Sequence, residues 1–320
     1  MNLIDRIFAQ PELQAAPPVL VDVGAAGGAH PAWRRIARHA IGVGFEPDVR
    51  EAAPLDAAQR QFKRWIFCPG LAVPEAAPDG QARLHLTRSP QCSSTLRPRA
   101  AAVGEWAFAD LFDVMETRAF PATTLQAALA AQGLDRVDWL KCDTQGLDLR
   151  LYLSLPQPWR SRMLAVEFEP GLTDVYEGED QLVDVLAAMK LEPFWLAELV
   201  VNRTPRGRPS LFAAYLSART ARWVRRLAPD APAWVNAQFL RDPAVDGEVL
   251  DRRALLLGWV FATMAGQPAH ALAIADEGTR RFGGDLFAAM TAASARALRR
   301  AMMRKLPAAI CRRLFRRLLA

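Results

Sequence analysis

The chain has 320 residues, a net charge of +6 and a hydrophobic share of 51%. This length favours one large domain with a smaller appendage, and the hydrophobic share excludes a disordered chain. Four isolated cysteines, without a CxxC pair or a nearby histidine cluster, argue against a disulfide framework or a zinc site and predict a reducing compartment.

Basic residues concentrate in the back third of the chain. Residues 201–320 hold 21 Lys and Arg against 8 Asp and Glu, whereas residues 1–200 hold 19 against 26. An acidic front half is a poor platform for nucleic acid, so we expect any anionic partner at the back third. The amino-terminal residues show no secretory signal pattern, and the longest apolar run, residues 254–266, is too short for a bilayer. We therefore expect a soluble, cytoplasmic protein.

Short apolar runs alternate with helical patterns through residue 216, which predicts a parallel sheet covered by helices. The predicted strands are apolar almost throughout, as in strands buried on both faces, and cover residues 19–24, 41–46, 65–73, 137–143 and 163–168. The predicted helices cover residues 31–39, 51–62, 124–131, 147–155 and 180–189. The fold class is thus α/β, with a doubly wound, mostly parallel sheet.

Two further segments modify this sheet. Residues 74–119 are irregular, although residues 82–87 alternate polar and apolar side chains and predict an extra strand. Such an excursion is typical of a lid or a substrate wall, or it only caps the sheet. Residues 194–201 and 210–216, joined by a polar turn, predict an antiparallel hairpin at the sheet edge.

From about residue 218 the composition turns to Ala, Arg and Leu, and we expect helices over residues 252–265, 268–281 and 286–306. The predicted organisation is a catalytic domain over residues 1–217 and a basic helical region over residues 218–320. Near the end an apolar stripe recurs every four residues, with arginines around it, and Pro307 is expected to divide it into two helices. The stripe comprises Leu298, Met302, Leu306, Ile310, Leu314 and Leu318. Residues 296–319 either dock on their own domain or lie on an anionic membrane.

Residues 21–28, VDVGAAGG, predict a strand that runs into a turn of small residues, where a ligand can approach the backbone. Glu46 ends the next strand, 22 residues after Gly24, where a carboxylate can accept hydrogen bonds from ribose hydroxyls. Ala26 stands where a dinucleotide site needs its second glycine, whereas S-adenosylmethionine has no phosphate to cradle. A turn that binds nothing is the alternative.

The chain resembles the FkbM-type methyltransferases over about residues 17–216. The resemblance rests on several motifs in order: VDVGAAGG (21–28), GFEPD (44–48), CSSTL (92–96), TTLQAAL (123–129), DWLKCDTQGLDLRLY (138–152) and VEFEP with YEGE (166–179). It implies a Rossmann-like methyltransferase fold and S-adenosylmethionine-dependent methylation of a hydroxyl, commonly on a sugar. The last hundred residues lie outside it.

The candidate catalytic residues are Asp143, Glu167 and Lys141. Asp143 ends the fourth strand, where doubly wound sheets place ligands, and it orients or deprotonates the acceptor or else caps the following helix. Glu167 is a second carboxylate, or it forms a buried pair with Lys141 that fixes the sheet. The candidate cofactor residues are Asp22, Gly24, Ala25, Gly27, Glu46 and Pro47. Ser93 and Ser94 line an acceptor pocket or satisfy a turn, and we expect no metal ion.

The leading functional prediction is an O-methyltransferase that uses S-adenosylmethionine and acts on a glycan or a small hydroxylated metabolite. A nicotinamide-dependent oxidoreductase is one alternative, disfavoured by the missing GxGxxG motif. A non-catalytic binding or scaffold protein that uses its basic helical tail is another. Nucleic acid is not expected as a partner.

Overall fold

The computed structural model describes residues 2–25, 28–48, 59–227, 231–243 and 250–318, with backbone only at residues 225, 226 and 305–318. The chain forms two compact units. One comprises residues 17–242, and the other comprises residues 1–16 together with residues 243–320.

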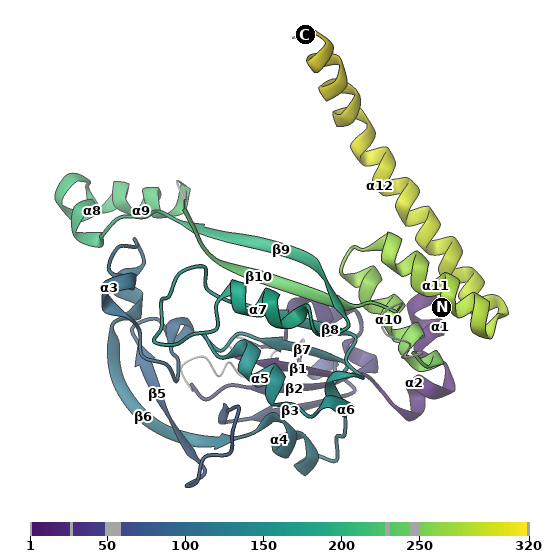
Figure 1. Cartoon of the computed structure of the whole chain (residues 1–320), viewed down its shortest axis with the longest axis horizontal. Helices are drawn as coiled ribbons and strands as arrows, with labels where there is room; N and C mark the ends of the chain where they lie inside the picture. The colour runs from purple at the N-terminus through teal and green to yellow at the C-terminus, as the bar shows by residue number, and fades with distance from the viewer. Residues whose placement is uncertain (1, 26–27, 49–58, 228–230, 244–249, 319–320) are drawn as a thin grey trace. The chain divides into compact units, whose positions relative to one another are not determined.

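A seven-stranded sheet lies at the centre of the unit of residues 17–242, in the order β3-β2-β1-β7-β8-β10-β9 (Figure 1). Its strands are β1 (Val19–Val23), β2 (Ile41–Phe45), β3 (Arg64–Cys68), β7 (Trp139–Cys142), β8 (Ala165–Phe168), β9 (Phe194–Thr204) and β10 (Ala231–Arg241). The first five are parallel, and β10 runs antiparallel to both β8 and β9. The predicted α/β class with a mostly parallel sheet is confirmed.

Alternating side chains give the sheet two apolar faces. On one face, Val21 of β1 and Leu140 of β7 pack in the same core cluster as buried side chains of the helices. These helices are α4 (Leu125–Ala131), α5 (Asp148–Ser154) and α7 (Leu182–Met189), and the short α6 (Gln157–Arg160) follows α5. On the other face, the ring of Trp33 lies 6.1 Å from that of Trp139.

The connection that carries Trp33 differs from the predicted helix over residues 31–39. It consists of two 3₁₀ turns, η1 (Pro31–Arg35) and η2 (Ala37–His39). Both turns lie in the crossover connection between the parallel strands β1 and β2. Of the helix predicted over residues 51–62, residues 51–58 lie outside the described part of the chain, and η3 (Gln59–Gln61) follows them.

A second, three-stranded sheet has the order β4-β6-β5 and is formed by β4 (Leu71–Ala72), β5 (Gln81–Thr87) and β6 (Val114–Thr123). The strand predicted over residues 82–87 is confirmed, and the run predicted over residues 65–73 divides into β3 and β4. Strand β6 was not expected, because its side chains are mostly exposed and lack the alternation of a half-buried strand. Between β5 and β6 lie η4 (Pro90–Cys92), α3 (Ala100–Val103) and η5 (Ala109–Phe112).

The antiparallel edge exists, but its predicted second strand is wrong. Residues 210–216 lie mostly in α8 (Pro209–Tyr215), which begins with a proline at its first position, and α9 (Ala218–Leu227) follows. The partner of β9 is β10, over the full length of both strands. The expected domain boundary after residue 217 therefore moves to residue 242, because β10 completes the sheet.

The other unit is helical, with α1 (Leu3–Phe8), α2 (Pro11–Ala15), α10 (Arg252–Met264), α11 (Pro268–Phe282) and α12 (Gly284–Leu318). Indole Nε1 of Trp259 donates to Ser294 Oγ at 2.9 Å, and Arg253 Nε donates to the carbonyl of Ala16 at 3.0 Å. All three predicted carboxy-terminal helices are present.

The predicted break at Pro307 is wrong, because α12 runs on to Leu318. A proline removes one amide donor from a helix and leaves the hydrogen bonds of the other turns in place. In the apolar stripe, Leu298 is half-buried and Met302 is exposed, and the side chains of its last four members lie outside the described part. Among the described helices, none has the length and apolar character needed to span a bilayer.

Candidate active site

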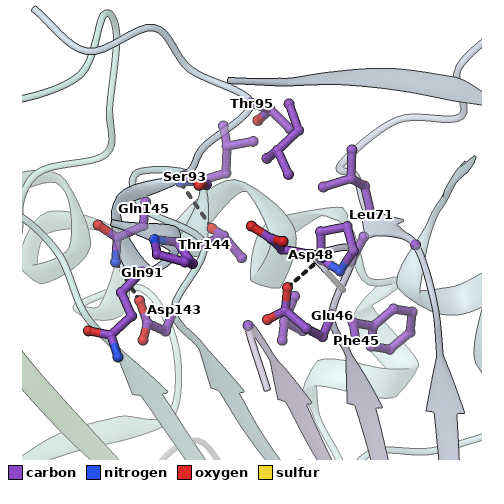
Figure 2. A pocket seen from close by; sticks show the side chains of 18 residues that line it. Phe45, Glu46, Asp48, Leu71, Gln91, Ser93, Thr95, Asp143, Thr144 and Gln145 are labelled. Atoms are coloured by element: carbon purple, nitrogen blue, oxygen red, sulfur yellow. Dashed lines mark hydrogen bonds between the residues drawn. The ribbon is translucent and has the colours of Figure 1, made fainter. Parts of the chain in front are cut away.

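Two adjoining cavities lie where β1, β2 and β7 reach their carboxyl ends. The smaller one, of about 100 Å³, is lined by Gly24, Glu46, Asp48, Leu71 and Asp143 among others (Figure 2). The larger one measures about 470 Å³. The walls of both include Gly24, Gln91, Asp143 and Gln145, so the cavities meet at these residues.

Gly24 is required by the packing of β1 against the end of β7. Its φ of 84° is left-handed, and a Cβ there would lie 2.1 Å from the carbonyl oxygen of Asp143. The amides of Gly24 and Ala25 both donate to the carbonyl of Phe45 at 3.0 Å. Gly24 and Ala25 are thus part of the framework of the site, while the predicted cofactor residue Gly27 lies outside the described part of the chain.

Glu46 follows β2 directly and lines the smaller cavity together with Pro47. The pairing of Val23 with Phe45 in adjacent parallel strands places Glu46 beside Gly24. Glu46 is 8% exposed, and its Oε1 accepts a hydrogen bond from the amide of Asp48 at 2.8 Å (Figure 2). The structure therefore brings the predicted residues Gly24, Glu46 and Pro47 to one cavity.

Asp22, Lys141 and Glu167 stand opposite one another on three neighbouring strands. Lys141 Nζ lies 3.1 Å from Asp22 Oδ1 and 3.7 Å from Asp143 Oδ2. Burial raises the pKa of Asp22, and Lys141 opposes this. Burial also disfavours the charge of Lys141, but Asp22 and Asp143 outweigh it and raise the pKa of Lys141. Asp22 and Lys141 line the larger cavity, not the smaller one.

Glu167 is in neither cavity wall. Its Oε1 lies 3.4 Å from His30 Nε2, whereas the shortest ion pair of Lys141 is with Asp22. The predicted Glu167–Lys141 pair is thus replaced by an Asp22–Lys141 pair, because Asp22 is the nearer carboxylate across the sheet.

Asp143 is not the cap of the following helix. Helix α5 begins at Asp148, and the amide and hydroxyl of Thr144 donate to Asp148 Oδ1 at 2.8 and 2.6 Å. Asp143 instead faces both cavities, with its side chain 27% exposed and its Oδ1 accepting from Gln145 Nε2 at 2.7 Å. Its carboxylate is held between an amide donor and an ammonium group.

Glu169 was missed by sequence reasoning and lines the larger cavity. Its Oε2 accepts from Asn236 Nδ2 at 2.8 Å, and Asn236 Oδ1 accepts from Asn202 Nδ2 at 2.7 Å. Its amide donates to Asp148 Oδ2 at 2.8 Å. Burial and then the nearby Asp143 raise the pKa of Glu169 to about 8. The signal for it was its place just past the end of β8, where ligands meet a doubly wound sheet.

Part of the remaining wall of the larger cavity is aromatic and acidic. The ring of Phe108 lies 6.3 Å from that of Trp234, and the ring of Phe112 lies 5.7 Å from that of Tyr176. Burial raises the pKa of Glu179, on the same wall, to about 7. The cavity therefore offers flat apolar surfaces beside hydrogen-bonding carboxyl groups.

The two serines have separate places. Ser93 lines the smaller cavity, and its Oγ accepts from the amide of Thr87 at 3.1 Å. Ser94 is buried, and its hydroxyl donates to the carbonyl of Gln145 at 2.8 Å. Ser94 thus fixes the turn that carries Gln145.

Across the described residues, no group of three or more His, Cys, Asp and Glu side chains is arranged to hold a metal ion. Comparisons of the chain with models of protein families, with curated proteins and with solved structures gave no match.

Proposed function

We propose that this chain transfers a methyl group from S-adenosylmethionine to a hydroxyl of a glycan or another small hydroxylated acceptor. The observation that carries the proposal is the pair of cavities that meet at Gly24 and Asp143. A group transfer between two molecules needs two compartments whose contents touch at one place. The resemblance to FkbM-type methyltransferases agrees with this assignment.

The smaller cavity fits the nucleoside part of the cofactor. Glu46 supplies a carboxylate beside the Gly24 turn, as a ribose requires. A cavity of about 100 Å³ is smaller than a typical small-molecule site. The rest of the cofactor would therefore extend toward Gly24 and Asp143, where the two cavities meet. The sheet also departs from the all-parallel dinucleotide order, because antiparallel β10 lies between β8 and the edge.

The larger cavity suits the acceptor. Its volume of about 470 Å³ lies within the range of small-molecule sites. Aromatic rings such as those of Phe108 and Trp234 pack against the apolar faces of a sugar, while carboxyl groups accept hydrogen bonds from its hydroxyls. This combination favours a sugar-containing acceptor.

The cofactor, when bound, supplies an electrophilic methyl group. Transfer to the acceptor oxygen would break the bond between this methyl group and sulfur and leave S-adenosylhomocysteine, while the proton of the acceptor hydroxyl must go to a base. Glu169 is our choice for that base, because its raised pKa lies near the working pH and Asn236 fixes its carboxyl group. Asp143 positions the acceptor, since its own carboxylate is occupied by Gln145 and Lys141.

The cofactor assignment is tested by replacing Glu46 with alanine. Calorimetry on the unaltered protein should detect binding of S-adenosylhomocysteine and no binding of NAD. In Glu46→Ala the affinity for S-adenosylhomocysteine should fall by roughly 1–3 kcal/mol, because the ribose hydroxyls lose a charged acceptor.

The matched control is Glu179→Gln, which alters a carboxyl group of the larger cavity. It should leave the affinity for S-adenosylhomocysteine unchanged, and both variants should melt near the temperature of the parent protein. Tight NAD binding, or equal effects of the two substitutions, would contradict the assignment.

A further inference from the structure

A basic arm leaves the sheet between β9 and β10. It comprises residues 205–227 and contains α8 and α9 (Figure 1). Within it the sequence holds six arginines and no acidic residue. At its base, the Arg206 guanidinium lies 4.8 Å from the centre of the Trp106 ring, and Arg208 lies 3.6 Å from Glu105. The arm is thus anchored near its first residues and carries a strong positive charge.

Helix α9 has an apolar side and a basic side. Trp223 and Leu227 are four residues apart and share one side, and they are 49% and 72% exposed. Arg219 lies four residues before Trp223 and so borders this side, whereas Arg222 lies further round the helix, and both are exposed. In α8, Tyr215 is 83% exposed. The apolar side of the arm is therefore open to solvent beside its arginines.

The chemistry of this arm matches one kind of surface. An amphipathic helix with arginines on its polar side and Trp or Leu on the other lies in the interface of a bilayer. Tyr and Trp rings also prefer the level of the lipid headgroups. Arginines with no acidic residue among them are complementary to anionic lipids. Each basic side chain near such a surface contributes about 1 kcal/mol of binding free energy.

We propose that residues 205–227 dock this protein on an anionic lipid bilayer, with Trp223 and Leu227 in the interface and Arg219 and Arg222 among the headgroups. The proposal stands independently of the methyl-transfer reaction. It also assigns membrane contact to a different segment from the carboxy-terminal residues 296–319.

The test uses the full chain with vesicles of phosphatidylcholine, with and without phosphatidylglycerol. The protein should sediment with the anionic vesicles only, and binding should fall as salt screens the charges. Arg219→Gln/Arg222→Gln should weaken vesicle binding about tenfold or more. Brominated lipids should quench tryptophan fluorescence, and Trp223→Phe should remove that quenching.

The matched control is Arg299→Gln/Arg300→Gln, which removes the same charge from exposed positions of α12. It should bind vesicles as the parent protein does, and all variants should melt alike. The proposal would be overturned if the parent protein did not bind anionic vesicles, or if only the α12 variant lost binding. It would also be overturned if light scattering showed that Trp223→Ser forms a smaller assembly than the parent protein. The last result would mean that a second copy covers the arm.

Discussion

Replacing Lys141 with methionine should lower the free energy of unfolding by about 3–5 kcal/mol, because it leaves Asp22 as a buried carboxylate without its cation. Chemical denaturation of the parent and of Lys141→Met measures the difference. In the variant, Asp22 escapes part of this cost by taking up a proton. Its folded pKa then lies above the unfolded value, so the stability of the variant should fall as pH rises between these two pKa values.

The control for this prediction is the double variant Asp22→Asn/Lys141→Met. With both charges removed, most of the lost stability should return, since replacing a whole buried pair costs far less than breaking it. A single variant that loses less than about 1 kcal/mol, or a double variant no more stable than the single one, would contradict a structural role for the pair.

Turnover should fall at least about a hundredfold when Glu169 is replaced by glutamine, because the acceptor hydroxyl would lose the group that we propose takes its proton. In the parent, kcat/KM should rise with pH through about 8, the pKa to which burial and Asp143 raise Glu169, since only its deprotonated form accepts a proton. Glu169→Gln should lose this rise. Steady-state kinetics from pH 6 to pH 9 measures both effects.

Asp143→Asn separates positioning from proton transfer. It should lower turnover by about tenfold or more and keep the rise with pH, because Glu169 is still present. Both variants should keep their affinity for S-adenosylhomocysteine and their melting temperature. If Glu169→Gln retains the pH profile of the parent, the base is another group.

The central part of the sheet was predictable because its strands are buried on both faces and show as apolar runs. Glu46 could be placed beside Gly24 for the same reason, since parallel neighbours end at one edge. Strand β10 was not found, because its surroundings are rich in Ala and Arg with helical spacing. Its strand state depends on pairing with β8 and β9, which are distant in sequence.

The acid–base part of the site was less predictable. Glu167 and Glu169 both follow the pattern of a carboxylate near a strand end, and the sequence cannot tell which one meets a cavity. That choice depends on Asn236 of β10, the strand that sequence reasoning missed. Aspartate is a common helix cap, so the sequence also allowed this role for Asp143. In the structure, Asp148 instead accepts the hydrogen bonds from Thr144 in the turn.

The helical unit joins both ends of the chain, and this sets an order of events during synthesis. The short helix α1 buries Ile7 and Phe8. It belongs to a unit whose long helices begin only at Arg252. At about 5–20 residues per second, a ribosome needs on the order of tens of seconds to make the residues between. Residues 17–242 are contiguous and can close their core during that time. The first sixteen residues meet the long helices of their unit only after that time.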